Sequence, residues 1–160
     1  MRFDQRTREQ LHDRFVESFH VGDAPSVVSE QELDRVELNL KTRLPASYRS
    51  FMSRHGIVHT PRVLDMICER NVDHPDVQDF LEPQEAIDDT RSYWAAGMPN
   101  DIIGIASDCM GNMIGFRRRS QTDDDAPVVF FDHDFVTAYN VAPSFDEFLA
   151  WYLDHLKGGG

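Results

Sequence analysis

The sequence predicts an α+β domain in which N-terminal helices pack on a mainly antiparallel sheet and a C-terminal helix closes the fold. Three observations lead to this class. Apolar residues recur at helical spacing in the first third of the chain, short runs with strand patterns follow, and the C-terminal stretch returns to helical spacing. Helices that are followed by a meander of strands are typical of α+β domains.

The first two helices are indicated by apolar spacing and by one cap. A helix is expected over about 4–19. Its apolar face is formed by Leu11, Phe15 and Phe19. The next helix has a clear start, because Ser29 is followed three residues later by Glu32. Such a capping box satisfies two backbone amides reciprocally, so we expect a helix near 29–41.

Turn residues indicate two further helices. Pro45 suits a first helical turn, where its missing N–H costs nothing, and Gly56 suits a left-handed C-terminal cap. These positions predict a helix near 45–55. Between the expected first and second strands, residues 83–97 are also expected to be helical.

The closing helix starts at a second expected capping box, Ser144 with Glu147. Its apolar residues recur at spacings of three, four and seven. The side chains expected in the core are Phe51, Phe145, Phe148 and Leu149.

Five short strands are expected between and after the helices. They cover residues 62–68, 102–107, 113–118, 128–133 and 135–141. Gly111 and Asn112 predict a tight turn between the second and third strands. The polar stretch 120–127 is expected to be the loop of the next hairpin.

Length and composition favour one domain over residues 1–157, with Gly158, Gly159 and Gly160 as a flexible tail. The chain has no run of 18 apolar residues and no apolar segment near its N-terminus, so we expect a cytoplasmic protein. Cys68 and Cys109 lie in apolar runs, where a buried free thiol is the usual outcome. No metal or cofactor motif is present.

The negative charge is concentrated in the second half of the chain. The formal net charge is −12, yet residues 1–70 hold eleven acids and eleven Lys or Arg. Residues 71–160 hold seventeen acids and five basic residues. A field of this sign repels nucleic acid and anionic lipid and attracts basic partners. Acidity that only keeps the protein soluble is the alternative interpretation.

Two acidic windows, 71–90 and 120–156, contain no Lys or Arg and predict a partner-binding surface. Their side chains in expected loops or at element ends are free to meet a partner. The predicted partner-binding residues are Asp73, Asp76, Asp79, Glu82, Asp123, Asp124, Asp125, Asp132 and Asp134. The basic run 117–119 is expected to pair with Asp123–Asp125 across the intervening loop.

Catalysis has two weak candidates. Asp132-His133-Asp134, with Asp108 as a further ligand, could hold a cation or act as a general base. Adjacent strand residues point to opposite faces, however, so a polar turn with solvated carboxylates is favoured. Cys109 with His133 could form a nucleophile–base pair, but no motif supplies an oxyanion hole. Without a phosphate-binding loop either, the chain is not expected to be an enzyme.

LPASYRSFM at 44–52, followed by His55-Gly56, is the first of several segments that together resemble the SUKH superfamily, whose pattern here is an LP-x-x-Y-x-x-F-[LM]…NG helix. The segment 102–108 followed by Gly111-Asn112 resembles its strand–D-x-x-G-[ND]–strand hairpin. Segment 128–134 resembles its strand with D-H-[DE], and APSFDEFL at 142–149 resembles its S-F-x-[ED]-F-L helix.

The resemblance covers residues 29–156 and departs from the pattern at His55, at Cys109-Met110 and in the extra N-terminal helix. It implies a non-enzymatic binding protein. Bacterial members are largely immunity proteins encoded beside polymorphic toxins, often nucleases, whereas eukaryotic members, such as yeast cell-wall assembly regulators, are adaptors. We therefore expect a monomer or weak dimer that binds a basic cognate toxin through its acidic surface. A scaffold or regulatory adaptor that binds another cytosolic protein is the alternative.

Overall fold

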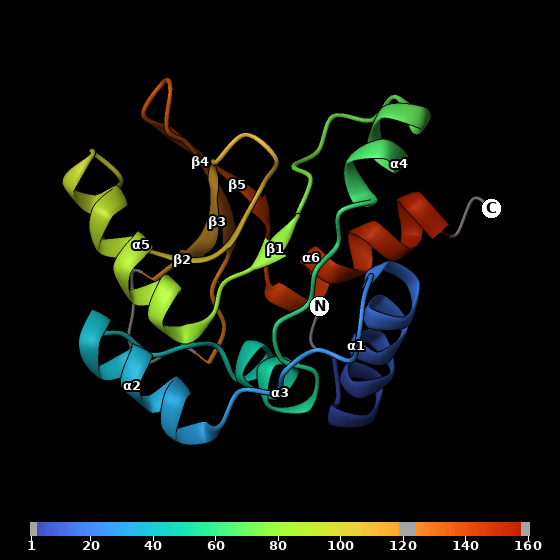
Figure 1. The fold of residues 1–160 in the computed structure, drawn as a ribbon, viewed down its shortest axis with the longest axis horizontal. Coiled ribbons are helices and arrows are strands. Elements are labelled where there is room, and N and C mark those ends of the chain that lie inside the picture. The colour runs from blue at the N-terminus through green and yellow to red at the C-terminus, as the bar shows by residue number, and fades with distance from the viewer. Residues whose placement is uncertain (1–2, 119–123, 158–160) are drawn as a thin grey trace.

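The computed structural model describes residues 3–118 and 124–157 and confirms the predicted α+β class (Figure 1). The helices are α1 (Gln5–Phe19), α2 (Glu30–Leu40), α3 (Ala46–Arg54), α4 (Val63–Arg70), α5 (Pro83–Ala95) and α6 (Phe145–Tyr152), which continues as a π-helical turn, Leu153–Lys157. The strands are β1 (Asp79–Phe80), β2 (Ile102–Ser107), β3 (Met113–Arg117), β4 (Val128–Asp132) and β5 (Thr137–Ala142). They form one antiparallel meander in the order β1-β2-β3-β4-β5.

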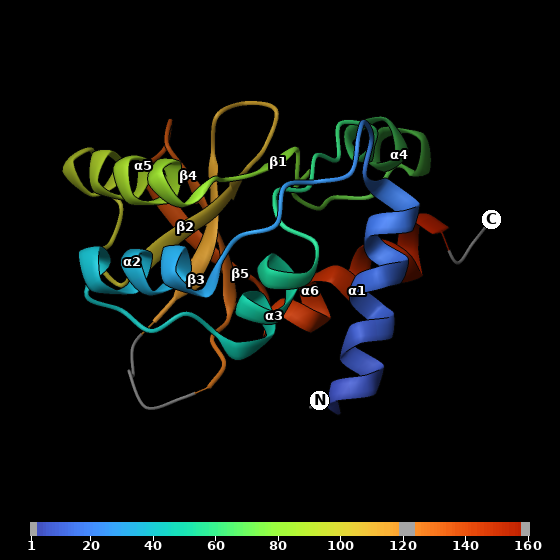
Figure 2. The ribbon, with the colours of Figure 1, turned by 60° about the horizontal axis from the view of Figure 1, so that its bottom comes forward.

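Helices cover both faces of the sheet. α3 and α6 lie on one face with α1 against α6, while α5 lies on the other face with α2 beside it (Figures 1 and 2). Strand residues alternate between these layers, so Ile103 and Ile114 join the larger core, whereas Ile102 and Met113 face α5. In the described residues, no helix is long and apolar enough to cross a membrane.

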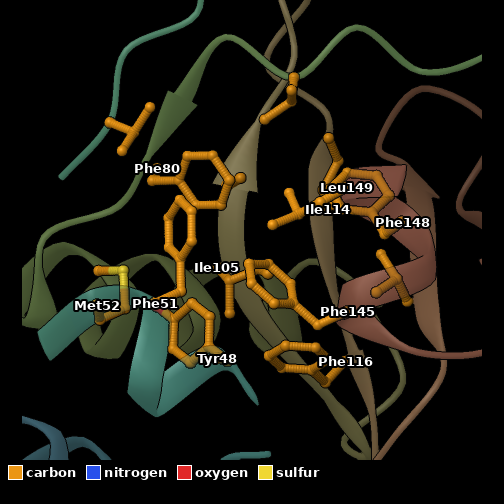
Figure 3. Packing of buried hydrophobic residues seen from close by; sticks show 14 of the residues in the cluster. Tyr48, Phe51, Met52, Phe80, Ile105, Ile114, Phe116, Phe145, Phe148 and Leu149 are labelled. Carbon is orange, nitrogen blue, oxygen red and sulfur yellow. The ribbon is translucent and has the colours of Figure 1, made fainter. Parts of the chain in front are cut away.

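The larger core is built around aromatic side chains from α3, α6 and the sheet (Figure 3). The four predicted core residues Phe51, Phe145, Phe148 and Leu149 are each 0% exposed, which confirms that prediction. Burying each of them stabilises the fold by roughly 1.5–3 kcal/mol.

Helix α1 belongs to this same core. Phe15 is fully buried, and His12 and Arg8 both reach the carboxylate of Asp146 on α6. The distances are 2.7 Å from His12 Nε2 and 2.8 Å from Arg8 Nε. Because Asp146 is itself buried, these bonds compensate for its lost hydration and fix α1 on α6.

The expected helix starts and stops are present. Ser29 and Glu32 form the predicted capping box. Pro45 is the N-terminal cap of α3, one residue before the first helical turn in which it was expected. Gly56 ends α3 with a φ of 89°. A Cβ at this position would lie 1.8 Å from the carbonyl oxygen of Ser26, so both the backbone angle and the space require glycine.

The strand expected over 62–68 is wrong, because this segment forms α4. Val63 and Ile67 are spaced by one helical turn and are both buried, which satisfies a helix as well as a strand. Asn71 closes the helix in the left-handed region with a φ of 53°. The first strand of the sheet is instead the two-residue β1, which follows α4 in the chain and pairs with the end of β2.

Two smaller expectations also need correction. The last strand begins at Thr137, two residues later than expected, because residues 133–136 form the turn before it. Cys68 and Cys109 are exposed free thiols, not buried ones. On α4, Val63 and Ile67 face the core and leave Cys68 outside, whereas Cys109 lies in the β2–β3 turn.

Candidate partner-binding surface

An acidic groove runs between α5 and the β1–β2 edge of the sheet and has a volume of about 380 Å³. Its four carboxylates are Asp79, Glu82, Glu85 and Asp89. Asp79 is placed by the antiparallel pairing of β1 with β2. Glu82 is the N-terminal cap of α5, and Glu85 and Asp89 follow at spacings of three and four, so all three acids lie along one side of that helix.

The carboxylates of the groove reinforce one another's negative field. Partial burial raises the pKa of Asp89, and the charges of Glu85 and Asp88 raise it further. The only cation-forming side chain that lines the groove among the described residues is His59, whose Nδ1 lies 2.7 Å from Asp79 Oδ1. A Lys or Arg side chain entering from a partner would relieve this repulsion.

The loop between α4 and β1 contains two of the predicted partner-binding residues, Asp73 and Asp76, and only Asp73 is free to meet a partner. Asp73 is exposed, as expected. Asp76 is only 9% exposed, so the expectation of a free side chain is wrong there. Its Oδ2 accepts hydrogen bonds from Gln78 Nε2 at 3.0 Å and from the backbone N–H of Cys109 at 3.1 Å. Asp76 therefore fixes the loop against the β2–β3 turn.

The β2–β3 and β4–β5 turns are joined at one end of the sheet. Asp108 accepts hydrogen bonds from the backbone N–H groups of Met110 and Asn112, which closes the predicted Gly111-Asn112 turn. Asn112 Oδ1 in turn accepts from the backbone N–H of His133 at 3.1 Å. We call the two turns, residues 108–112 and 132–136, together with Tyr139 on β5, the hairpin end.

Asp132 and Asp134 have different roles at the hairpin end. One oxygen of Asp132 accepts from the backbone N–H groups of Asp134 and Phe135 at 2.9 and 3.1 Å, so this carboxylate shapes the turn. The side chain of Asp134 is 71% exposed and lies 3.4 Å from His133 Nε2. It is the freer of the two acids for contact with a partner.

The residues of both catalytic candidates lie at this end. Within the described residues, no three His, Cys, Asp or Glu side chains are grouped as metal ligands. Partial burial of the sulfur, followed by its hydrogen bond to Asp76 and the nearby charges, raises the pKa of Cys109 to about 11. The thiol therefore stays protonated at neutral pH, whereas a catalytic cysteine needs a lowered pKa.

The second predicted acidic segment is tied to the N-terminal half of the chain. Asp124 forms a 2.7 Å ion pair with Arg43, and its backbone oxygen accepts from the N–H of Ala46. Arg118 donates to the backbone oxygens of Arg43 and Asp125. Arg118 thus contacts the backbone of this segment, and Asp124 pairs with a distant arginine. Arg119 and Asp123 lie outside the described residues.

Sequence reasoning missed two acids of the groove. Glu85 and Asp89 lie inside the acidic window, but a search for acids in loops or at element ends does not find them, because both fall within a helix. The signal that identifies them is helical spacing from Glu82, which places residues at i+3 and i+7 on the same face.

Comparison with known proteins identifies relatives of this chain. Over 160 aligned positions the chain is 25% identical to the SPbeta prophage-derived uncharacterized protein YokK of Bacillus subtilis (strain 168). The alignment covers 83% of this chain and 79% of that protein. The model of the SMI1 / KNR4 family (SUKH-1) matches residues 27–151, which include every strand and the segments that suggested the resemblance. The chain is therefore a member of the SMI1 / KNR4 (SUKH-1) family.

Proposed function

We propose that this protein is an immunity protein that binds and neutralises a cognate toxin in the cytoplasm by contact, without catalysis. The family to which it belongs often supplies immunity proteins. The observation that carries the proposal is the acidic groove, in which four carboxylates gather beside a single histidine. Toxins that act on nucleic acid are basic around their sites, because they must bind phosphates.

The charge of the groove suits rapid capture of such a toxin. Complementary fields raise association rates by factors of about 10 to 1,000, and the effect falls as salt screens the charges. An immunity protein has to reach its toxin before the toxin reaches its substrate. A strong acidic field over one part of the surface provides that advantage.

The test screens the proteins encoded beside the gene for this chain for a domain that stops cell growth, and uses that domain as the candidate toxin. Co-expression with the wild-type chain should restore growth of cells that produce the domain, and the two purified proteins should form a one-to-one complex. The double variant Asp79→Asn, Glu82→Gln should slow association about threefold to tenfold at low salt, because steering weakens.

The matched control removes two exposed carboxylates elsewhere. Asp65→Asn with Glu69→Gln on α4 changes the net charge equally but leaves the groove intact. Association with this control should stay within about twofold of the wild type. If no neighbouring protein is neutralised, and the chain instead binds a non-toxic cytosolic protein, the adaptor alternative replaces this proposal. If both double variants and added salt leave the rate unchanged, the acidity serves only solubility.

A further inference from the structure

The hairpin end exposes an unusual share of the apolar surface. Seven large apolar side chains are exposed in the described part of the chain, and four of them lie at this end. They are Met110, Phe135, Val136 and Tyr139, with exposed fractions of 68%, 78%, 51% and 52%. Exposed aromatic and methionine side chains that gather in one region are typical of protein–protein contact sites.

The two turns are held rigidly enough to present these side chains. Besides the Asn112–His133 bond, the Tyr93 hydroxyl of α5 donates to the backbone oxygen of Gly111. The β4–β5 turn also approaches the segment that follows α5, where Gly97 lies close to Val136. A Cβ on Gly97 would lie only 2.8 Å from the Val136 Cγ1 atom. In Figure 1 both turns project at the top of the molecule, near the C-terminal end of α5.

The backbone of the β4–β5 turn is strained at the centre of this region. Val136 has a φ of 52°, although a β-branched side chain strongly disfavours the left-handed region. A turn that served only to reverse the chain would be more stable with Gly or Asn at this position. Val136 and its neighbour Phe135 are both exposed apolar side chains, and backbone strain of this kind is concentrated at functional sites.

The acidic side chains around these apolar residues outnumber the single histidine of the hairpin end, His133. Asp73, Asp108, Asp132 and Asp134 surround or belong to the hairpin end. Partial burial raises the pKa of Tyr139, and the charges of Asp73, Asp132 and Asp108 raise it further, which places all three acids near that ring. The sequence has no Lys or Arg in residues 71–90, 92–116 or 120–156, the stretches that supply this end.

We infer that the hairpin end is the contact that holds the toxin, through Phe135 and Tyr139 at its centre and Asp73 and Asp134 at its rim. This inference rests on the proposed function. The matching surface on the toxin is a shallow apolar depression bordered by Lys or Arg, by charge complementarity. A second copy of this chain is a poor occupant, because a two-fold contact would place the same carboxylates opposite one another.

The experiment measures binding of the neighbouring toxin domain to single variants by stopped-flow and surface-based kinetics. Phe135→Ser should raise the dissociation constant about 30-fold, mainly through faster dissociation, as for a central aromatic anchor. Asp134→Asn should mainly slow association at low salt. The matched control is Leu38→Ser, which changes an 80% exposed side chain. Its helix, α2, lies away from the two turns (Figures 1 and 2). This control should bind within about twofold of the wild type.

The outcomes separate the two proposals. If the wild type does not bind or neutralise the toxin domain, the proposed function fails. If the wild type binds and both Phe135→Ser and Tyr139→Ser bind equally well, the hairpin end is not the contact, although the proposed function stands. If the same variants abolish self-association measured by sedimentation and leave toxin binding unchanged, the occupant is a second copy and the inference is wrong. Unchanged urea midpoints of all variants show that each result reflects binding.

Discussion

Replacing Phe15 by alanine tests whether α1, which lies outside the matched family segment, is part of the core. Phe15 is 0% exposed. Its ring centroid lies 5.1 Å from that of Phe19, 6.2 Å from Phe51, 6.4 Å from Phe80 and 6.0 Å from Tyr152. The side chain therefore connects α1 with α3, β1 and α6.

The expected cost is about 4 kcal/mol. Phe→Ala changes in cores cost roughly 3–5 kcal/mol, and the value rises when the cavity cannot collapse. Three of the four surrounding rings are held by other elements and the fourth, Phe19, by α1 itself, so collapse onto the vacated space is limited. Each favourable aromatic pair also contributes about 0.5–1.5 kcal/mol beyond its buried area. A loss near 4 kcal/mol is a large fraction of the 5–15 kcal/mol typical for a domain.

The assay is urea-induced unfolding at pH 7, followed by far-UV circular dichroism. With an m value of about 2 kcal/mol per molar, the midpoint should fall by about 2 M. Leu38→Ala, which removes an 80% exposed side chain from α2, should change the free energy of unfolding by less than about 0.5 kcal/mol. A loss below about 1 kcal/mol for Phe15→Ala would show that α1 is only loosely attached.

Three further predictions concern the pH dependence and the backbone. Burial and the charge of His155 lower the pKa of His74 to about 4, below its ordinary value of 6.5. Its contribution to stability is therefore complete above about pH 6.5 and is lost as the pH falls towards 4, by roughly 2 kcal/mol after allowance for solvent screening. His74→Phe, which can keep the 3.5 Å stack on Trp151, should flatten the stability profile between pH 7 and 4.5, and an unchanged slope would contradict the assignment. Gly56→Ala should cost more than about 2 kcal/mol in urea unfolding, because a Cβ meets the Ser26 carbonyl; a smaller loss would mean that this loop yields. In a Cys68→Ser background, alkylation of Cys109 by iodoacetamide should rise with a midpoint near pH 11, whereas rapid labelling at pH 7 would revive the nucleophile hypothesis.

The elements that could be predicted from the sequence are those with local chemical signals. Ser29 with Glu32 and Gly56 fix helix ends through bonds within a few residues, so their effect survives in any tertiary context. The failure at 62–68 arose because a short apolar run fits a strand as well as a helix. The choice between helix and strand depends on how Val63 and Ile67 are buried, and their burial depends on the rest of the fold.

The negative charge of the candidate site could be predicted from the sequence, but the spatial arrangement of its residues could not. Charge counting locates the acids along the chain, but it cannot tell that Asp76 is buried or that Asp124 is paired with Arg43. Both facts depend on contacts between segments far apart in sequence. The exposure of the apolar residues at the hairpin end could not be predicted from the sequence either. Phe135 follows a polar cluster in a strand-like pattern, and only the turn closed by Asp132 places it in solvent.

The groove and the hairpin end are suited to different steps of one binding event. Charges act over about 10 Å at 0.1 M salt, so under the proposed function the carboxylates of the groove would draw the basic toxin in before contact. They contribute less once contact is made, because exposed pairs keep much of their water. Apolar side chains such as Phe135 act only at contact, where burying them slows dissociation. Tyr93 on α5 lines the groove and donates a hydrogen bond to the β2–β3 turn, so a toxin steered to the groove would arrive beside the hairpin end.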